Sequence, residues 1–327
     1  MSAPSLTDRR RVGRTDLTIG PLGFGGTRIG NLFAGVSDVR ADGAVEAAWA
    51  AGVRYFDTAP LYGLGLSEER LGRALGRHPR DEYVLSTKVG RAVAPNPSAR
   101  GGRAEGLFDV PDDRIGVRDY SADGVRRSLE ASLERLGTDR IDIVLVHDPD
   151  DHLDQAITEA IPALVRLRDE GVVRAIGAGM NQWQALQLLV RRCDLDVVMV
   201  AGRWTLLDRT AAPLLDECLE RGVSVLAAAP YNSGLLARSE PPDDATFDYT
   251  QASPHLLART RELALRARRH GATLPEAALQ FPLLHPAVVA VVTGMATAEE
   301  ARTAAARLST PVSTAFWAAL AEGDSQG

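Results

Sequence analysis

The sequence of 327 residues predicts a (β/α)8 barrel, also called a TIM barrel. Eight short runs rich in Val, Ile, Leu and Phe alternate with longer stretches whose apolar residues recur at helical spacing. Several runs stop abruptly at a polar residue, and because the strands of such a repeat share one direction, these residues would gather on one face. The predicted strands cover residues 19–25, 54–58, 83–88, 142–147, 173–179, 196–201, 223–229 and 288–294.

Helices are predicted between these strands, and local signals mark their ends. Ser67 and Ser121 each precede acidic residues in the pattern of a helix N-cap. Glycine follows several helices just before the next strand, as expected of C-terminal caps, at Gly52, Gly171, Gly222 and Gly271. The predicted helices cover residues 39–51, 67–77, 121–137, 153–171, 182–193, 210–221, 255–270, 274–285 and 297–307.

A doubly wound open sheet is the competing fold. That fold expects a glycine-rich phosphate turn between the first strand and a helix, with an acid closing the second strand. Gly23, Gly25 and Gly26 follow this pattern, and Asp57 ends the second strand, but no helix begins directly after the glycines. The eight repeats therefore favour the closed barrel.

The chain is predicted to form a single domain, residues 1–327, with the barrel proper at about 12–320. Residues 12–20 (VGRTDLTIG) are predicted to form a β-hairpin that plugs the lower end of the barrel. The connections 90–119 and 230–254 are too long to be simple turns. Both follow strands, so we expect both long loops on the C-terminal face, where they could cover a ligand.

Composition excludes several classes of function. A net charge of −6 and a pI of about 5.6 argue against nucleic acid as a partner, because phosphate binding needs a basic face. No apolar run is long enough to cross a bilayer, and the N-terminus lacks the apolar segment of a signal peptide. Cys193 and Cys218 lie far apart, without metal-ligand spacing. We expect a cytoplasmic protein without a metal site that acts on a small molecule.

Four residues at or near predicted strand ends could handle protons. Asp57 and Tyr62 lie in YFDTAPLYG, Lys88 in VLSTKVG and His147 in IVLVHD. A phenol has a pKa of about 10, which a nearby ammonium would lower, while a carboxylate would hold that ammonium in place. Lys88 could be this ammonium and Asp57 this carboxylate. Tyr62 would then act as general acid and base, and His147 would donate a hydrogen bond to a substrate oxygen.

Each of these residues alone has an ordinary structural interpretation. Asp57 could cap a helix, Tyr62 could be a packing residue, Lys88 could face solvent and His147 could be a core histidine. Their coincidence on one predicted face is what indicates catalysis. No Ser or Cys stands beside a base, so covalent catalysis is disfavoured.

The same four residues resemble the signature of the aldo-keto reductase superfamily, DTAxxYG…STK…H, and the resemblance extends over about residues 12–320. It implies a barrel that carries an extended nicotinamide dinucleotide and transfers a hydride, with Tyr62 as proton donor or acceptor. The segments GAGMNQW, AGRWTLLD and PYNSGLLA are similar to the branch of L-fucose (D-threo-aldose) dehydrogenases and pyridoxal 4-dehydrogenase. This implies oxidation of a cyclic hemiacetal, such as an aldose, to a lactone.

The resemblance also implies a set of cofactor-binding residues. Trp204 stands where the family places an aromatic residue on the nicotinamide ring, with a core tryptophan as the alternative. Asn181 lies one place later than the family's usual Asn, and the segment after the seventh strand would contact the pyrophosphate. The implied residues are Gly26, Thr27, Asn181, Trp204, Asn232, Ser233, Gly234, Leu235, Gly294 and Thr297.

The segment GMATAEEARTA (294–304) bears on the choice of cofactor. NADPH-dependent relatives usually place Lys or Arg with Ser here, whereas this chain has Glu299 and Glu300, which would repel a 2′-phosphate. Arg302 is the cation near them in sequence and is expected to face solvent. We therefore predict NAD, with NADP as the alternative.

Other functions stay open at this point. The chain could be a broad NADPH-dependent aldehyde or ketone reductase, or a cofactor-binding regulatory subunit, although the proton-handling residues argue against the latter. The substrate pocket is predicted to use Phe33, Tyr120 and Tyr249, which could equally be packing residues.

Overall fold

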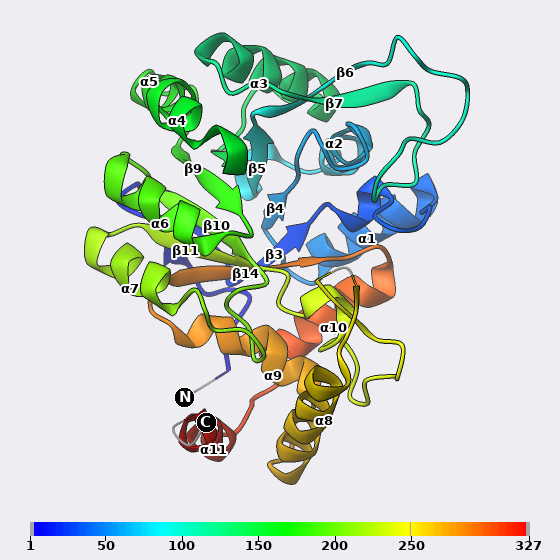
Figure 1. Ribbon diagram of the computed structural model, residues 1–327, viewed down its shortest axis with the longest axis vertical. Coiled ribbons are helices and arrows are strands. Elements are labelled where there is room, and N and C mark those ends of the chain that lie inside the picture. The colour runs from blue at the N-terminus through cyan, green and yellow to red at the C-terminus, as the bar shows by residue number, and fades with distance from the viewer. Residues whose placement is uncertain (1–2, 249, 325–327) are drawn as a thin grey trace.

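The computed structural model, which describes residues 3–248 and 250–324, confirms the predicted barrel. Eight parallel strands close on themselves in chain order at the centre of Figure 1, and helices surround them. The eight strands are β3 (Leu22–Gly25), β4 (Tyr55–Asp57), β5 (Val84–Val89), β8 (Ile143–His147), β9 (Ala175–Met180), β10 (Val197–Ala201), β11 (Ser224–Ala228) and β14 (Val288–Gly294).

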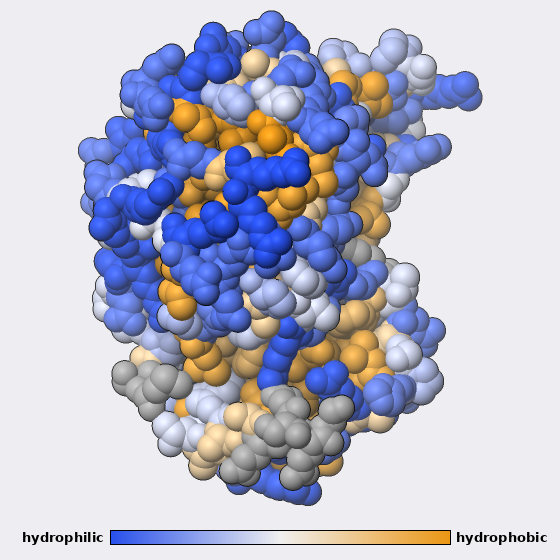
Figure 2. Space-filling view, turned by 60° about the vertical axis from the view of Figure 1, so that its left-hand side comes forward, coloured by the Kyte–Doolittle hydropathy of each residue, from blue (hydrophilic) through white to orange (hydrophobic). Residues whose placement is uncertain are grey.

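The helices cover the outside of this barrel, as their amphipathic spacing indicated. In Figure 2 hydrophilic residues dominate the outer surface in view, with apolar residues showing between them. The helices are α1 (Asp38–Ala50), α2 (Leu66–Leu75), α3 (Ala122–Leu136), α4 (Leu153–Gln155), α5 (Ile161–Asp169), α6 (Trp183–Arg192), α7 (Ala212–Arg221), α8 (Pro254–Arg269), α9 (Leu274–Gln280), α10 (Ala298–Ser309) and α11 (Thr314–Asp324). Within residues 3–248 and 250–324, none of them has the length and apolar character needed to span a membrane.

The two predicted serine caps have different outcomes. Ser121 caps α3, because its side chain accepts a hydrogen bond from the Gly124 N–H at 3.0 Å. The prediction for Ser67 is wrong, since α2 begins one residue earlier, after Gly65. The Ser67 hydroxyl is fully buried and instead donates to the Gly26 carbonyl at 2.8 Å.

Two predicted helices are interrupted at prolines. The segment predicted as 153–171 is divided into α4, a π-helical turn at Ala156–Ala160 and α5, with Pro162 at the start of α5. The segment predicted as 274–285 continues from α9 into a 3-10 turn at Phe281–Leu284 that contains Pro282. Proline lacks the N–H that an α-helix would use at these positions, which accounts for the changes in hydrogen-bonding pattern.

The N-terminal hairpin closes the lower end of the barrel, as predicted, with shifted strand bounds. It consists of β1 (Arg10–Arg11) and β2 (Thr18–Ile19), so Ile19 belongs to the hairpin and not to the first barrel strand. The Gly13 N–H donates to Ser224 Oγ, at the first residue of β11, over 2.7 Å. Val12 and Leu17 are buried against the residues inside the barrel.

The two long loops lie beside the opposite end. Residues 90–119 contain an antiparallel hairpin, β6 (Arg91–Pro95) with β7 (Arg114–Arg118), which Figure 1 shows in cyan at the edge of the molecule. Its tip bonds to the loop after β3, because the Phe33 N–H donates to the Leu107 carbonyl at 2.8 Å. The loop 230–254 contains a 3-10 turn and the short strands β12 (Thr246–Phe247) and β13 (Thr250–Gln251). Residues of both loops line one cavity with the strand ends.

Candidate active site

The C-terminal strand ends bring the four proton-handling residues into one cavity of about 2080 Å³. Asp57 is the last residue of β4, Lys88 lies near the end of β5 and His147 is the last residue of β8. Tyr62 comes from the turn that follows β4. The parallel direction of the strands places these side chains together, as the sequence predicted.

Asp57 and Lys88 form a buried ion pair at the floor of this cavity. The Lys88 ammonium donates to Asp57 Oδ2 at 2.7 Å and to the Thr58 carbonyl at 2.9 Å, and both side chains are at most 3% exposed. The second carboxylate oxygen accepts from Ser86 Oγ at 2.7 Å. Burial lowers the pKa of Lys88, but Asp57 and Tyr62 together, through their charges and hydrogen bonds, outweigh burial and raise this pKa above its usual value. The lysine is therefore charged and oriented.

Tyr62 lies over this pair. The Lys88 nitrogen is 4.7 Å from the centre of the Tyr62 ring, and the His147 ring meets the phenol edge to face with centroids 5.7 Å apart. Burial nevertheless raises the pKa of Tyr62 to about 12, and Lys88 offsets this only in part. The expected lowering of this pKa is thus not found, because burial outweighs the effect of Lys88 and the charge of Asp57 adds to that of burial. At neutral pH the phenol keeps its proton.

His147 is held neutral. Burial, aided by the positive charges of Lys88 and Arg91, lowers the pKa of His147 well below its usual value. Its Nε2 lies 3.6 Å from Asp148 Oδ2, whereas its buried Nδ1 has no hydrogen-bond partner within the described ranges. A carboxylate that faces only Nε2 favours the tautomer with the proton on that nitrogen. The ring can then offer a hydrogen bond to an oxygen in the cavity.

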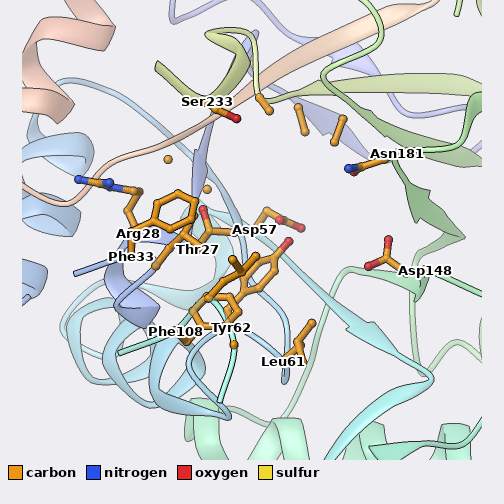
Figure 3. A pocket seen from close by; sticks show the side chains of 18 of the residues that line it. Thr27, Arg28, Phe33, Asp57, Leu61, Tyr62, Phe108, Asp148, Asn181 and Ser233 are labelled. Atoms are coloured by element: carbon orange, nitrogen blue, oxygen red, sulfur yellow. The ribbon is translucent and has the colours of Figure 1, made fainter. Parts of the chain in front are cut away.

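Six of the ten predicted cofactor residues line the same cavity, and Figure 3 shows Thr27, Asn181 and Ser233 around it. Asn232 is 2% exposed, and its side-chain nitrogen donates to the Gly202 carbonyl at 3.1 Å. Its Oδ1 is buried without a partner among the described residues, so a ligand could donate to it. The six are Thr27, Asn181, Asn232, Ser233, Gly234 and Gly294.

The other four predicted cofactor-binding residues do not line the cavity, because they pack in the interior or cap a helix. A Cβ on Gly26 would come 2.5 Å from Ser67 Oγ, so this glycine is needed for close packing against α2. Trp204 packs on Phe281, with centroids 5.3 Å apart, as its alternative interpretation as a core tryptophan expects, and its stacking on a nicotinamide ring stays a prediction. Leu235 is fully buried in an apolar cluster, and Thr297 caps α10 by accepting from the Glu300 N–H at 3.1 Å.

Of the predicted substrate-pocket residues, Phe33 and Tyr120 have different positions relative to the cavity. Phe33 lines the cavity and is 52% exposed. Tyr120 does not line it, since its ring is fully buried beneath the loop after β8 and its hydroxyl lies 2.7 Å from the His147 and Asp148 carbonyl oxygens. Tyr249 lies outside the described residues.

Several cavity residues were missed by the sequence analysis. Asp148 directly follows His147, so its place at a strand end could have indicated it. Phe108 and Arg91 come from the long loop after β5, where no periodic pattern shows which residues turn inward (Figure 3 shows Phe108 beside Tyr62). Arg28 and Arg307 line the cavity near the end of β14, whereas Arg302 is exposed and does not.

In the part of the chain that the structure describes, no group of three or more His, Cys, Asp or Glu side chains is arranged to hold a metal ion.

Comparisons with known proteins agree with this geometry. The model of the aldo/keto reductase family matches residues 21–324. D-threo-aldose 1-dehydrogenase of Pseudomonas sp is 47% identical over 310 residues, which cover 94% of each protein. Pyridoxal 4-dehydrogenase of Microbacterium luteolum is 36% identical over 96% of each protein. The holo structure of an aldo-keto reductase from Bacillus halodurans has a TM-score of 0.75 at 26% identity, over 96% of this chain and 95% of that one.

The match covers nearly the whole barrel, from β3 to α11, and includes the residues that converge in the cavity. Aldo-keto reductases use nicotinamide cofactors. The resemblance found in the sequence is thereby confirmed: the chain belongs to the aldo/keto reductase family and is an NAD(P)-dependent oxidoreductase.

Proposed function

We propose that this protein oxidises the cyclic hemiacetal of an aldose to a lactone, with NAD as the cofactor. The observation that carries this proposal is the 47% identity, over 94% of the chain, to a D-threo-aldose 1-dehydrogenase. An L-galactose dehydrogenase of Arabidopsis thaliana, 32% identical over 89% of this chain and 85% of that protein, supports the same substrate class.

The cavity suits an extended dinucleotide. It runs from Thr27 and Asn181 to the turn at Asn232–Gly234 and on to Gly294. Asn232 Oδ1, which has no partner among the described residues, could accept a hydrogen bond from an amide group of the cofactor. These residues would hold the cofactor, which supplies the acceptor for the hydride that leaves the carbinol carbon.

The protein's own residues would move the proton. As the carbon–oxygen double bond forms, the carbinol O–H proton passes to the Tyr62 oxygen. His147 Nε2–H donates to the same substrate oxygen and holds it beside Tyr62. Lys88, which Asp57 holds in place, keeps a positive charge next to the phenol and so stabilises the phenolate that must accept the proton.

The Tyr62 pKa of about 12 gives a direction for the pH dependence. Oxidation needs the deprotonated phenol, whose fraction grows tenfold with each pH unit below that value. We therefore expect kcat/KM for aldose oxidation to rise between about pH 6 and about pH 9 without a plateau.

The charged side chains at this end of the cavity support NAD over NADP. Glu299 and Glu300 line the cavity, and Glu300 accepts from the Ala296 N–H at 2.6 Å while lying 4.0 Å from Arg28. Arg307 is engaged by the Tyr231 hydroxyl and the Ala237 carbonyl. Arg307 thus already has partners, and the two carboxylates disfavour an added phosphate. A higher kcat/KM with NADP than with NAD would contradict this preference.

A panel of aldoses and aldehydes tests the proposal. Nicotinamide absorbance follows turnover with both cofactors in both directions, and lactone is detected directly. Tyr62→Phe should lower kcat by about 100- to 10,000-fold while cofactor binding, followed by fluorescence, is retained. Efficient aldehyde reduction with NADPH and no aldose oxidation would favour the general reductase instead. Unchanged turnover in Tyr62→Phe would exclude the catalytic scheme.

A further inference from the structure

We propose that Asp148 recognises the hydroxyl groups of a polyhydroxylated substrate, through its carboxylate oxygen Oδ1. The inference rests on the proposed aldose oxidation and adds the residue that would distinguish a sugar from a plain aldehyde. Three features of Asp148 support the proposal: its backbone conformation, the contacts of its carboxylate, and its position beside His147.

Asp148 has an unusual backbone for a side chain that faces a cavity. Its φ is +43°, in the left-handed region that L residues rarely adopt. Such conformations persist where the surroundings enforce them, and they concentrate at functional sites. Figure 3 shows the Asp148 carboxyl group extending into the cavity from the strand end, on the side toward which Tyr62 directs its hydroxyl.

Buried neighbours hold this conformation. The Asp148 N–H donates to the Gly179 carbonyl at 3.0 Å. From below, the Tyr120 hydroxyl lies 2.7 Å from both the His147 and the Asp148 carbonyl oxygens. Gly90 makes room for that ring, because a Cβ on Gly90 would lie 2.2 Å from Tyr120 Cε1. The carboxylate therefore projects from a rigid support.

The two oxygens of the carboxylate have different surroundings. Oδ2 accepts from Arg91 Nη1 at 2.6 Å and lies 3.6 Å from His147 Nε2. Oδ1 has no protein partner in the described part of the chain, and the side chain lines the cavity and is 31% exposed. An ionised carboxylate oxygen only accepts hydrogen bonds, and a hydroxyl donates them. Oδ1 is thus oriented and available to a hydroxyl close to the carbinol that His147 would hold.

A purely structural role is the competing explanation. The Arg91–Asp148 pair joins β6 to the end of β8 and could simply fasten the β6–β7 hairpin to the barrel. In that case, loss of the carboxylate would affect stability, and all substrates alike. If Asp148 recognises hydroxyl groups, the loss of activity should instead be larger for substrates that carry those hydroxyls. The two explanations therefore predict different results.

The test compares substrates that differ in their hydroxyls. Asp148→Asn keeps the size of the side chain and tolerates a positive φ. With this variant we expect kcat/KM for L-fucose oxidation and for glyceraldehyde reduction to fall by about 10- to 100-fold, and for propanal reduction to change by less than about threefold. The control is Asp154→Asn, which removes an exposed carboxylate six residues away that does not line the cavity, and it should leave all three values unchanged.

Each outcome decides between the explanations. Equal losses for glyceraldehyde and propanal, or no loss for either, would overturn the recognition role. If the wild-type protein oxidises no aldose, the proposed function fails, yet the glyceraldehyde and propanal comparison still decides the role of Asp148. If Asp148→Asn does not fold, Arg91→Lys, which changes the anchor of Oδ2, is assayed on the same pair. An unchanged preference for glyceraldehyde in that variant would count against the inference.

Discussion

Replacing Lys88 with Met tests the electrostatic basis of the site. The change removes an ammonium 4.7 Å from the centre of the Tyr62 ring while keeping a side chain of similar length. At that distance two unit charges interact by about 3.5 kcal/mol at an effective dielectric constant of about 20. Without the ammonium 2.7 Å from its Oδ2, the buried Asp57 carboxylate takes up a proton more readily. This removes its repulsion of the phenolate and offsets part of the loss, so we take about 2 kcal/mol as the net value. The pKa of Tyr62, already raised to about 12, would rise by about 1.5 further.

The assay is the pH dependence of aldose oxidation. A rise of about 1.5 in the pKa makes the phenolate about 30-fold rarer at any pH below it, so kcat/KM should fall by about that factor. The dependence on pH should keep the same slope in the variant. A loss below about threefold, in protein shown to be folded by circular dichroism, would refute the view that Lys88 makes Tyr62 more acidic.

Stability provides the control for this experiment. Lys88→Met leaves the Asp57 carboxylate buried without its cation, which should cost about 3–5 kcal/mol of folding free energy. The double variant Asp57→Asn with Lys88→Met carries no buried charge at this position and should recover most of that loss. It should not recover the activity. Restored turnover in the double variant would show that the single variant failed through folding alone.

Three further outcomes are expected. Because the pKa of His147 is lowered in the folded protein, acid protonates this histidine more readily in the unfolded chain. The melting temperature should therefore decrease as the pH is lowered from about 6.5, and it should decrease less in His147→Gln. Trp204→Phe should destabilise the fold by about 1–2 kcal/mol, since the indole N–H donates to the Pro282 carbonyl, and leave KM for NAD unchanged; a large rise in KM would restore a stacking role. Gly90→Ala, at φ +94° and against the Tyr120 ring, should cost more than about 2 kcal/mol in denaturant unfolding, and a neutral change would contradict this packing.

Much of the fold could be predicted because its signals are local. Apolar runs marked all eight barrel strands to within a few residues, since buried parallel strands need continuous apolar sequence. The capping serines show the limit of such signals. Ser121 and Ser67 have similar neighbours in sequence, but Ser67 is drawn to the Gly26 carbonyl by a contact that no local pattern contains.

The site was predictable where chemistry and topology coincide. Asp57, Lys88 and His147 follow from strand direction alone, because parallel strands end on one face. Trp204 was not predictable in this way, because side-chain packing on Phe281 decides which way the indole turns. The inward-facing residues of the loop after β5 depend on its hydrogen bonds to the loop after β3, which join segments far apart in the chain.

The sequence by itself determined the barrel, the order of its strands and the set of proton-handling groups, because these depend on periodicity and on residue type. Only the tertiary structure decided their energetics and their surroundings. The pKa of Tyr62 depends on the balance between burial, Lys88 and Asp57, and the free oxygen of Asp148 depends on Arg91 from a distant hairpin. Desolvation and charge–charge interactions act through space, so they become defined only when the folded chain fixes the distances between the groups.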